Sequence, residues 1–308
     1  MKRSASARAR RLAAADVALL AAFLLVANVD PFGLRARRLL HTSGHIAKIL
    51  YDGGKLEQAA AAYQRAAAEY PEDPDIRNGW GIALDRLGQR EAARAQYEAA
   101  LAAAPDHFEA RFNLAAHAHE EGALADAAMA YREAIGSAPW RADARLNLGV
   151  VYAQMDSLDH AAAELDTALL LEPHYREASL NLASIEMRRN APERAAAIYR
   201  RLLAGNPNAQ AATGLGAALE KTGDHIGAQE AFRSALRIEP ENPAALFQLG
   251  MNLAGFQRFE EAIATWKRLL ERDPGNEAAR AAIAEARSRL AARQAGADTT
   301  AGKSPARN

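Results

Sequence analysis

The residues best suited to hold a metal ion lie in one short stretch, residues 117–121, which read His-Ala-His-Glu-Glu. In a helix, side chains two residues apart point roughly 200° away from each other, so the two histidines do not readily share one metal ion. Near the C-terminus, residues 302–304 read Gly-Lys-Ser, which is similar to the end of a phosphate-binding loop. Ala297 replaces the upstream glycine that this loop requires, and no strand pattern precedes it, so we expect no nucleotide there.

Other catalytic chemistry has no better support. The chain contains no cysteine, which excludes thiol catalysis, cysteine-based zinc sites, disulfides and a lipoprotein cysteine. Acidic residues are numerous, but the sequence places no pair of them in a closed pocket. The 38 basic and 38 acidic residues cancel, which gives no support for a nucleic-acid partner. We therefore predict a protein that is not an enzyme, with no cofactor, no metal site and no small-molecule substrate.

The strongest pattern in the sequence is a repeat. Prolines recur every 34 residues, with one interval of 33, at Pro71, Pro105, Pro139, Pro173, Pro207, Pro240 and Pro274. With this proline as position 32, position 20 is always alanine: Ala59, Ala93, Ala127, Ala161, Ala195, Ala228 and Ala262. Position 24 is always large, and aromatic in all but one copy: Tyr63, Tyr97, Tyr131, Leu165, Tyr199, Phe232 and Trp266.

Each column has a physical role. Positions 7, 8 and 11 lie on one face of a first helix, and positions 20, 24 and 27 lie on one face of a second helix. Small residues at positions 8 and 20 let the two helices approach closely, and the aromatic at position 24 fills the space beside them. Proline at position 32 stops the second helix. Glycine at position 15 ends the first helix in a left-handed cap, at Gly54, Gly88, Gly122 and Gly223.

This pattern closely resembles the tetratricopeptide-repeat (TPR) family. The resemblance implies an all-α fold, a right-handed solenoid of helix-turn-helix repeats whose first helices line a concave groove for partner peptides. Over residues 40–274 we expect seven repeats, at 40–73, 74–107, 108–141, 142–175, 176–208, 209–242 and 243–276. Asp156, Asn190 and Gln257 replace the glycine of position 15, so we expect those first helices to end differently. The junction before repeat 6 is one residue short, which we expect to change the stacking angle there.

The last repeat needs a cap over its apolar face. Residues 276–293 supply one, because Ala279, Ala282, Ile283, Ala286 and Leu290 form one stripe of a helix. The tail, residues 294–308, is small and polar, so we expect it to be disordered.

The N-terminus carries a hydrophobic segment. A basic flank, residues 1–11, precedes residues 12–29, an apolar run whose only charge is Asp16, and residues 30–39 form a juxtamembrane linker. As a helix the run would be about 27 Å long, enough to cross a bilayer core. We predict an uncleaved transmembrane signal anchor; a cleaved signal peptide and a buried amphipathic helix are the alternatives.

The charges around this segment predict its orientation. Five basic residues precede it and three follow it, so the positive-inside rule favours a cytoplasmic N-terminus. We therefore predict a single-pass protein of the bacterial inner membrane whose repeat domain lies in the periplasm.

Three residue columns are candidates for a partner-binding groove. Positions 2, 6, 9 and 13 share the face of the first helix opposite its packing positions, and we call this the groove face. Position 6 is Asn113, Asn147 and Asn181 in three successive repeats. Such amides can grip an extended peptide backbone, as in a similar ladder in O-linked N-acetylglucosamine transferases, although asparagine is also common at this position in TPR proteins.

The other two columns are charged. Position 2 is acidic at Asp75, Glu109, Asp143 and Glu177, which either favours basic partners or reflects carboxylates at helix N-termini. Position 4 is Arg77, Arg111 and Arg145, which either pack through their stems or recognise an acidic group on a partner. These columns depart from the family's carboxylate clamp, so a chaperone-tail adaptor is disfavoured.

These observations favour a membrane-anchored scaffold that holds a protein or peptide partner and supports assembly of an envelope or secreted complex. Two alternatives are a regulatory subunit of a membrane-associated enzyme and a self-assembling TPR coat.

Overall fold

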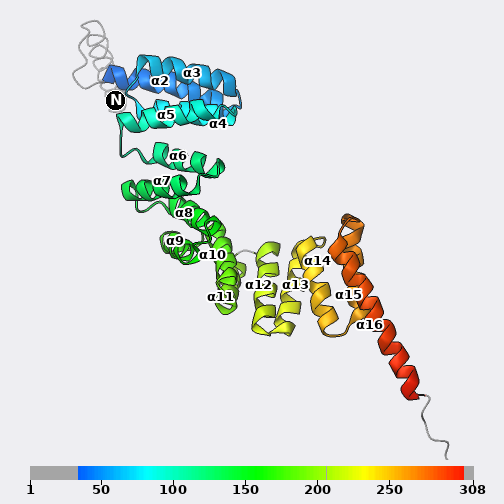
Figure 1. Ribbon diagram of the computed structural model, residues 1–308. Coiled ribbons are helices and arrows are strands. Elements are labelled where there is room, and N and C mark those ends of the chain that lie inside the picture. Colours follow the sequence, from blue (N-terminus) through cyan, green and yellow to red (C-terminus); the bar gives the residue numbers. More distant parts are fainter. Residues whose placement is uncertain (1–33, 206, 302–308) are drawn as a thin grey trace, which may run out of the picture. The chain divides into compact units, whose positions relative to one another are not determined.

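The computed structural model describes the backbone of residues 34–205 and 207–301, and the side chains of residues 43–205 and 207–294. This part of the chain is entirely helical and contains no strand (Figure 1). It divides into two compact units, Met1–His117 and Ala118–Asn308, and each is described by itself. The helices are α2 (Leu34–Asp52), α3 (Leu56–Glu69), α4 (Pro74–Arg86), α5 (Arg90–Ala103), α6 (Phe108–Glu120), α7 (Leu124–Ser137), α8 (Ala142–Gln154), α9 (Leu158–Leu171), α10 (Arg176–Arg188), α11 (Pro192–Gly205), α12 (Ala209–Thr222), α13 (His225–Ile238), α14 (Pro243–Gly255), α15 (Phe259–Arg272) and α16 (Glu277–Ala301).

Helices α2 to α15 are the first and second helices of the repeats, and α16 is the capping helix. Many helices that are neighbours in the sequence pack against each other, as α4 does with α5 in the first unit, and α8 with α9 and α12 with α13 in the second (Figure 1). A repeat of this kind buries its apolar face only against its neighbours, so stacking creates the core.

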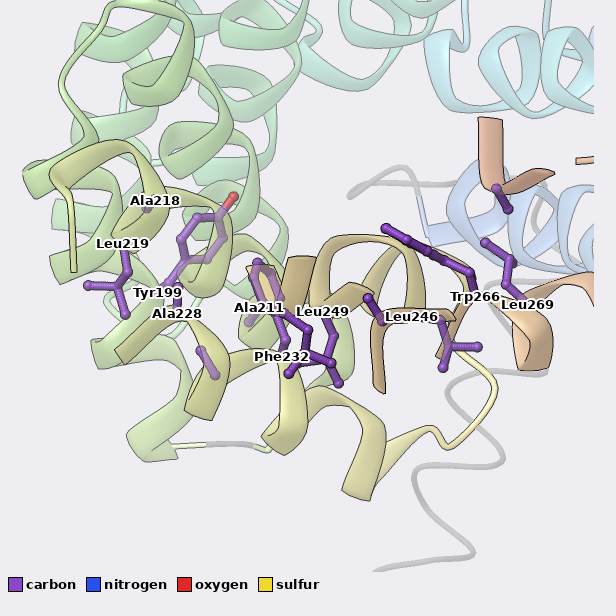
Figure 2. Packing of buried hydrophobic residues seen from close by; sticks show 14 of the residues in the cluster. Tyr199, Ala211, Ala218, Leu219, Ala228, Phe232, Leu246, Leu249, Trp266 and Leu269 are labelled. Carbon is purple, nitrogen blue, oxygen red and sulfur yellow. The ribbon is translucent and has the colours of Figure 1, made fainter. Parts of the chain in front are cut away.

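The core confirms the predicted roles of positions 8, 20 and 24. All seven alanines of position 20 are fully buried. A methyl group added to Gly216 or Gly250 at position 8 would lie within 2.4 Å of the position-24 ring of its own repeat, Phe232 or Trp266. Figure 2 shows these rings with Tyr199 and the leucines that lie between them. The ring at position 24 therefore occupies the space that a larger side chain at position 8 would need.

The first helices all end in the same way, which corrects the expectation for repeats 4, 5 and 7. Asp156, Asn190 and Gln257 have φ of 57°, 58° and 59°, the left-handed conformation that glycine adopts in the other repeats. Asparagine and aspartate tolerate this conformation better than most residues, whereas glutamine has no such advantage. The packing of the two helices therefore determines the turn, and the residue accommodates to it.

Two helices extend past boundaries that the sequence predicted. Helix α2 begins at Leu34, inside the predicted linker 30–39 and before the expected repeat start at residue 40. Helix α16 continues beyond residue 293 to Ala301, through residues that were expected to be disordered, because this segment contains several alanines and no proline. The rest of the tail, residues 302–308, lies outside the described residues.

The transmembrane prediction concerns residues that the structure does not describe. Residues 12–29 lie outside the described residues, as do residues 1–11. In the described part of the chain, no helix combines the length and the apolar character needed to span a bilayer.

Candidate functional site

The three asparagines of position 6 are half-buried on the groove face, and the structure describes them in two parts. Asn113 lies in the first unit, where its Nδ2 donates to Oδ1 of Asn78 at 2.8 Å, one repeat earlier. Asn147 and Asn181 lie in the second unit, on α8 and α10. Each amide carries two N–H donors and an oxygen with two lone pairs, so one internal bond leaves Asn113 with further capacity.

Asn147 contacts the ring of the preceding repeat. Its side chain hydrogen-bonds to Tyr131, whose ring is 1% exposed. Burial raises the pKa of Tyr131 to about 12, and the bond to Asn147 opposes this rise only in part. Asn147 therefore satisfies a buried phenol as well as facing the groove, which gives this position a packing role beside any binding role.

The acidic column of position 2 is engaged mainly by neighbouring side chains. Asp75 Oδ1 lies 3.1 Å from His107 Nε2, and Glu177 Oε1 lies 3.2 Å from Arg176 Nη2. Burial acts to raise the pKa of Asp143, but the hydrogen bonds and charge of Arg141 outweigh it and lower the pKa.

Glu109 is exposed in the first turn of α6, and the other three acids also lie near helix N-termini. This placement suits the helix dipole.

The arginines of position 4 have partners on the second helices or at the prolines between repeats. Arg77 Nη1 donates to Gln96 Oε1 at 3.0 Å, and its Nε donates to the carbonyl of Pro71 at 3.3 Å. Arg111 donates to the carbonyl of Pro105. Arg145 Nη1 lies 2.9 Å from Glu164 Oε2, and its side chain is only 18% exposed. These guanidinium groups lie between successive repeats, so the structure does not group them with the asparagines in one site.

The groove face of the second unit contains a hollow that the three columns did not predict. It has a volume of about 350 Å³ and lies where α12, α13 and α14 meet, lined by Glu220, His225, Gln248, Met251, Asn252, Gly255 and Phe256. Gln248, Met251 and Gly255 occupy positions 6, 9 and 13 of repeat 7. Met251 and Phe256 are 49% and 43% exposed, and together they give the hollow an apolar rim.

The floor of this hollow is a hydrogen-bonded polar network around Asn252, which is 6% exposed. The Asn252 Nδ2 group donates to the Glu220 carboxylate and, at 2.8 Å, to the carbonyl of His225. The Asn252 oxygen accepts from Gln229 Nε2 at 2.8 Å, and Arg258 Nη1 donates to Gln229 Oε1 at 3.1 Å. Every polar atom of the Asn252 amide is thus used, which holds the Glu220 carboxylate in a defined position.

Two further contacts complete the hollow. His225 Nδ1 lies 2.7 Å from Glu220 Oε2, and the imidazole meets the ring of Phe256 edge-on at 6.3 Å. At the other end of the network, hydrogen bonds from Arg258 lower the pKa of Glu261. The hollow therefore presents one oriented carboxylate, amide groups and an apolar rim. Such groups are better suited to binding a peptide side chain than to catalysis.

The first unit contains a polar link at equivalent positions. Asp85 accepts from the Tyr97 hydroxyl at 2.7 Å, and its other oxygen lies 3.2 Å from His117 Nδ1. His117 is 3% exposed. His119 instead lies 2.9 Å from Gln154 Oε1, so the two histidines of residues 117–121 have different partners. Among the described residues, no group of three or more His, Cys, Asp or Glu is placed to hold a metal ion.

A sequence signal for both links exists but was missed. His117 and Asn252 stand at position 10 of their repeats, where the other copies have Ile, Ala or Val. Their partners Asp85 and Glu220 stand at position 12 of the preceding repeat, 32 residues earlier in both cases. A polar residue at a core position of a repeat predicts a hydrogen-bonding partner in the neighbouring repeat, because buried polar groups are almost always hydrogen-bonded.

Fold and columns together define an all-helical TPR-like solenoid, and the family comparisons agree. Models of the tetratricopeptide repeat match residues 46–89, 78–140 and 118–174. A model described as the middle TPR-like domain of cilia and flagella-associated protein 70 matches residues 180–296. These matches support the tetratricopeptide-repeat family for this chain. A comparison with curated proteins gave no match.

Solved structures with the same fold include three proteins of low sequence identity. The C-terminal part of a TPR repeat-containing protein from Cytophaga hutchinsonii is 14% identical, with a TM-score of 0.67, over 78% of this chain and 99% of that chain. Pseudomonas aeruginosa pilF is 20% identical, with a TM-score of 0.57, over 69% and 97%. YrrB, described as a TPR protein with an unusual peptide-binding site, is 20% identical, with a TM-score of 0.55, over 61% and 97%. At such identities the likeness shows the fold.

Proposed function

We propose that this chain is a non-enzymatic scaffold that binds a peptide or protein segment along the groove face of its first helices. The observation that carries the proposal is the hollow of repeats 6 and 7. There, Met251 and Phe256 stand exposed around the fixed carboxylate of Glu220. A thioether and a ring offer adaptable apolar contact, and a carboxylate held by two donors offers a directional one. Such a combination is suited to hold a side chain of an extended peptide.

The amides of the groove face extend this site toward repeats 4 and 5. Gln248 lines the hollow at position 6, and Asn147 and Asn181 stand at the same position of earlier repeats. Side-chain amides pair with backbone N–H and C=O groups without reading the sequence of a peptide. The hollow would then supply specificity and the amides would supply general affinity. The peptide-binding site in the name of YrrB, a structural relative, supports this use of the fold.

We propose further that residues 12–29 anchor the scaffold in the bacterial inner membrane, with the repeats in the periplasm. The apolar run and the basic residues before it support this assignment. A scaffold so placed would assist the assembly of an envelope or secreted complex.

A site-specific crosslink tests the groove. The photo-reactive residue p-benzoylphenylalanine is introduced at Met251 in the full-length chain, and at Lys267 as a control, because Lys267 is exposed on the second helix α15. Detergent-solubilised membranes of the native host are then irradiated. We expect a crosslinked partner from position 251 and none from position 267. Equal yields from both positions, or none from either, would refute groove binding.

Substitution of the asparagines separates the alternatives. We expect the triple change of Asn113, Asn147 and Asn181 to alanine to reduce co-purification of the crosslinked partner. An enzyme recovered unchanged with the triple variant would favour the regulatory subunit, and large homo-oligomers would favour the coat.

Protease treatment of spheroplasts tests the topology. We expect digestion of the repeats by added protease, and a protected repeat domain would overturn the periplasmic assignment.

A further inference from the structure

The arginines of position 4 close a slot between successive repeats. We define the position-4 slot as the space bordered by position 4 of a first helix, the proline at position 32 before it and position 23 of the second helix after it. Arg77 spans this slot in repeat 2, from the Pro71 carbonyl to Gln96. Arg111 reaches the equivalent carbonyl in repeat 3, and Arg145 reaches position 23 of repeat 4.

The same slot is open in repeat 5. Position 4 is Ser179 there, and its hydroxyl donates back to the carbonyl of Tyr175 at 3.2 Å, so it does not cross the slot. A recess of about 370 Å³ occupies the space, lined by Asp166, Leu169, Leu170, Pro173, Ser179, Leu182, Arg194, Ile198 and Arg201. Pro173, Ser179 and Ile198 are the position-32, position-4 and position-23 residues that define the slot. In repeats 6 and 7, position 4 is Ala212 and Leu246, and both are fully buried.

The wall at position 23 is apolar in the open slot and polar in the filled slots of repeats 2 and 4. Ile198 stands at position 23, where Arg77 and Arg145 find Gln96 and Glu164. Leu170 is 81% exposed, and position 29 is small or charged in every other copy. An exposed leucine beside a recess of this size is the kind of surface that another apolar side chain covers.

The rim of the open slot is basic. Arg194 lies 2.5 Å from Asp166 and 3.1 Å from Glu186, a carboxylate that is only 1% exposed, so its guanidinium is held in place. Arg201 borders the same recess, and it makes no hydrogen bond or ion pair with any described residue. Asp166 is the one carboxylate in the lining, and Arg194 already engages it. The uncompensated charge at this rim is therefore positive.

We propose that the open slot of repeat 5 is a docking site for a partner segment in which an apolar side chain is flanked by carboxylates. The apolar side chain enters between Leu170 and Ile198, in the space that arginine fills in repeats 2 to 4. A carboxylate beside it pairs with Arg201, which supplies charge complementarity. This site borders the second helices α9 and α11, whereas the groove face belongs to the first helices, so it is independent of the function proposed above.

A synthetic peptide tests the proposal directly. The probe is a dye-labelled hexapeptide, Glu-Glu-Leu-Leu-Glu-Glu, titrated with the full-length chain in detergent at low salt and followed by fluorescence anisotropy. We expect saturable binding in the micromolar range that weakens as salt is added. We expect Ser179→Arg to weaken it at least about tenfold, because the new side chain closes the slot as in repeats 2 to 4. Ser179→Ala is the matched control and should bind as the original chain does.

A second variant keeps the test decisive if Ser179→Arg misfolds. Arg201→Glu changes an exposed residue and should also weaken binding at least about tenfold through like-charge repulsion. Met251→Ala, in the groove, should leave binding unchanged. Equal binding by Arg201→Glu or by a folded Ser179→Arg would overturn the proposal. So would equal binding of a peptide with lysine in place of glutamate, or no saturable binding of the probe.

Discussion

Replacing Gly250 with alanine adds a methyl group where the indole of Trp266 already lies. The new Cβ would stand 2.3 Å from Nε1 and 2.4 Å from Cε2 of the ring, closer than carbon atoms in folded proteins approach such groups. The ring cannot turn away freely, because it is 1% exposed and its Nε1 donates to the carbonyl of Phe247 at 3.1 Å. Whether α14 moves away from α15 or the indole is displaced, this hydrogen bond between the two helices is lost.

The expected cost follows from these contacts. Overpacking a dense core costs about 1–3 kcal/mol. A buried N–H left without its acceptor costs about 1–3 kcal/mol more. The higher helix propensity of alanine than of glycine offsets about 1 kcal/mol of this loss of stability. We therefore expect Gly250→Ala to lower the free energy of unfolding by about 3 kcal/mol.

Urea unfolding followed by tryptophan fluorescence and far-ultraviolet circular dichroism measures this change. The matched control is Gly136→Ala, because Gly136 is exposed in α7 and nothing lies within 4 Å of its added methyl group. The control should stabilise the protein by up to about 1 kcal/mol. A loss below about 1 kcal/mol for Gly250→Ala, or a change of the same sign as the control, would refute the proposed role of position 8.

Three further outcomes are expected from other features of the structure. Gln257→Gly should raise the free energy of unfolding by about 1 kcal/mol, because glycine adopts a φ of 59° without strain; a loss of stability in the same urea assay would contradict this. Asn252→Ala should lower the free energy of unfolding by about 2–3 kcal/mol, because Glu220 and Gln229 lose their hydrogen-bonding partner. Met251 is half-exposed, so Met251→Ala should lower it by less than about 1 kcal/mol. Equal losses for the two variants would count against the network. The pKa of Tyr131, raised to about 12 in the fold from 10.0, implies stability that is complete below pH 10 and falls by up to about 3 kcal/mol as the pH rises through 12. Alkaline titration of helix content should show this fall in the original chain and a smaller one in Tyr131→Phe.

The fold could be predicted from the sequence because the same packing contacts recur in every repeat of a solenoid. Alanine at position 20 and an aromatic at position 24 specify how two helices pack, and seven copies make the pattern readable. The turn at position 15 was harder to predict. Gln257 shows no preference for a left-handed backbone, and only the closeness of the two helices imposes it. Local residue propensity therefore did not predict the backbone conformation at position 15, because the packing of the two helices determines it.

The site was less predictable because its residues are the ones that leave the repeat pattern. The asparagines of position 6 are visible as a column, yet Asn113 and Asn147 also serve internal contacts that a column cannot reveal. The hollow depends on Asn252, which appears once and acquires meaning only beside Glu220. The open slot depends on Ser179, a small residue at the position that arginine occupies in repeats 2 to 4. A serine at this position forms no recognisable motif, so the sequence alone does not indicate the recess.

Glu186 has a consequence for the evolution and engineering of the array. It stands at position 11, where repeats 1, 2, 6 and 7 have leucine, and its carboxylate is sealed between Arg189 and Arg194. Those arginines also pair with Asp159 and Asp166 of the preceding repeat. Removing repeat 4, or moving repeat 5 behind another copy, would take away the two aspartates that help to hold these arginines beside the buried carboxylate. We therefore expect repeats 4 and 5 to tolerate separation less well than repeats that no such ion pairs join.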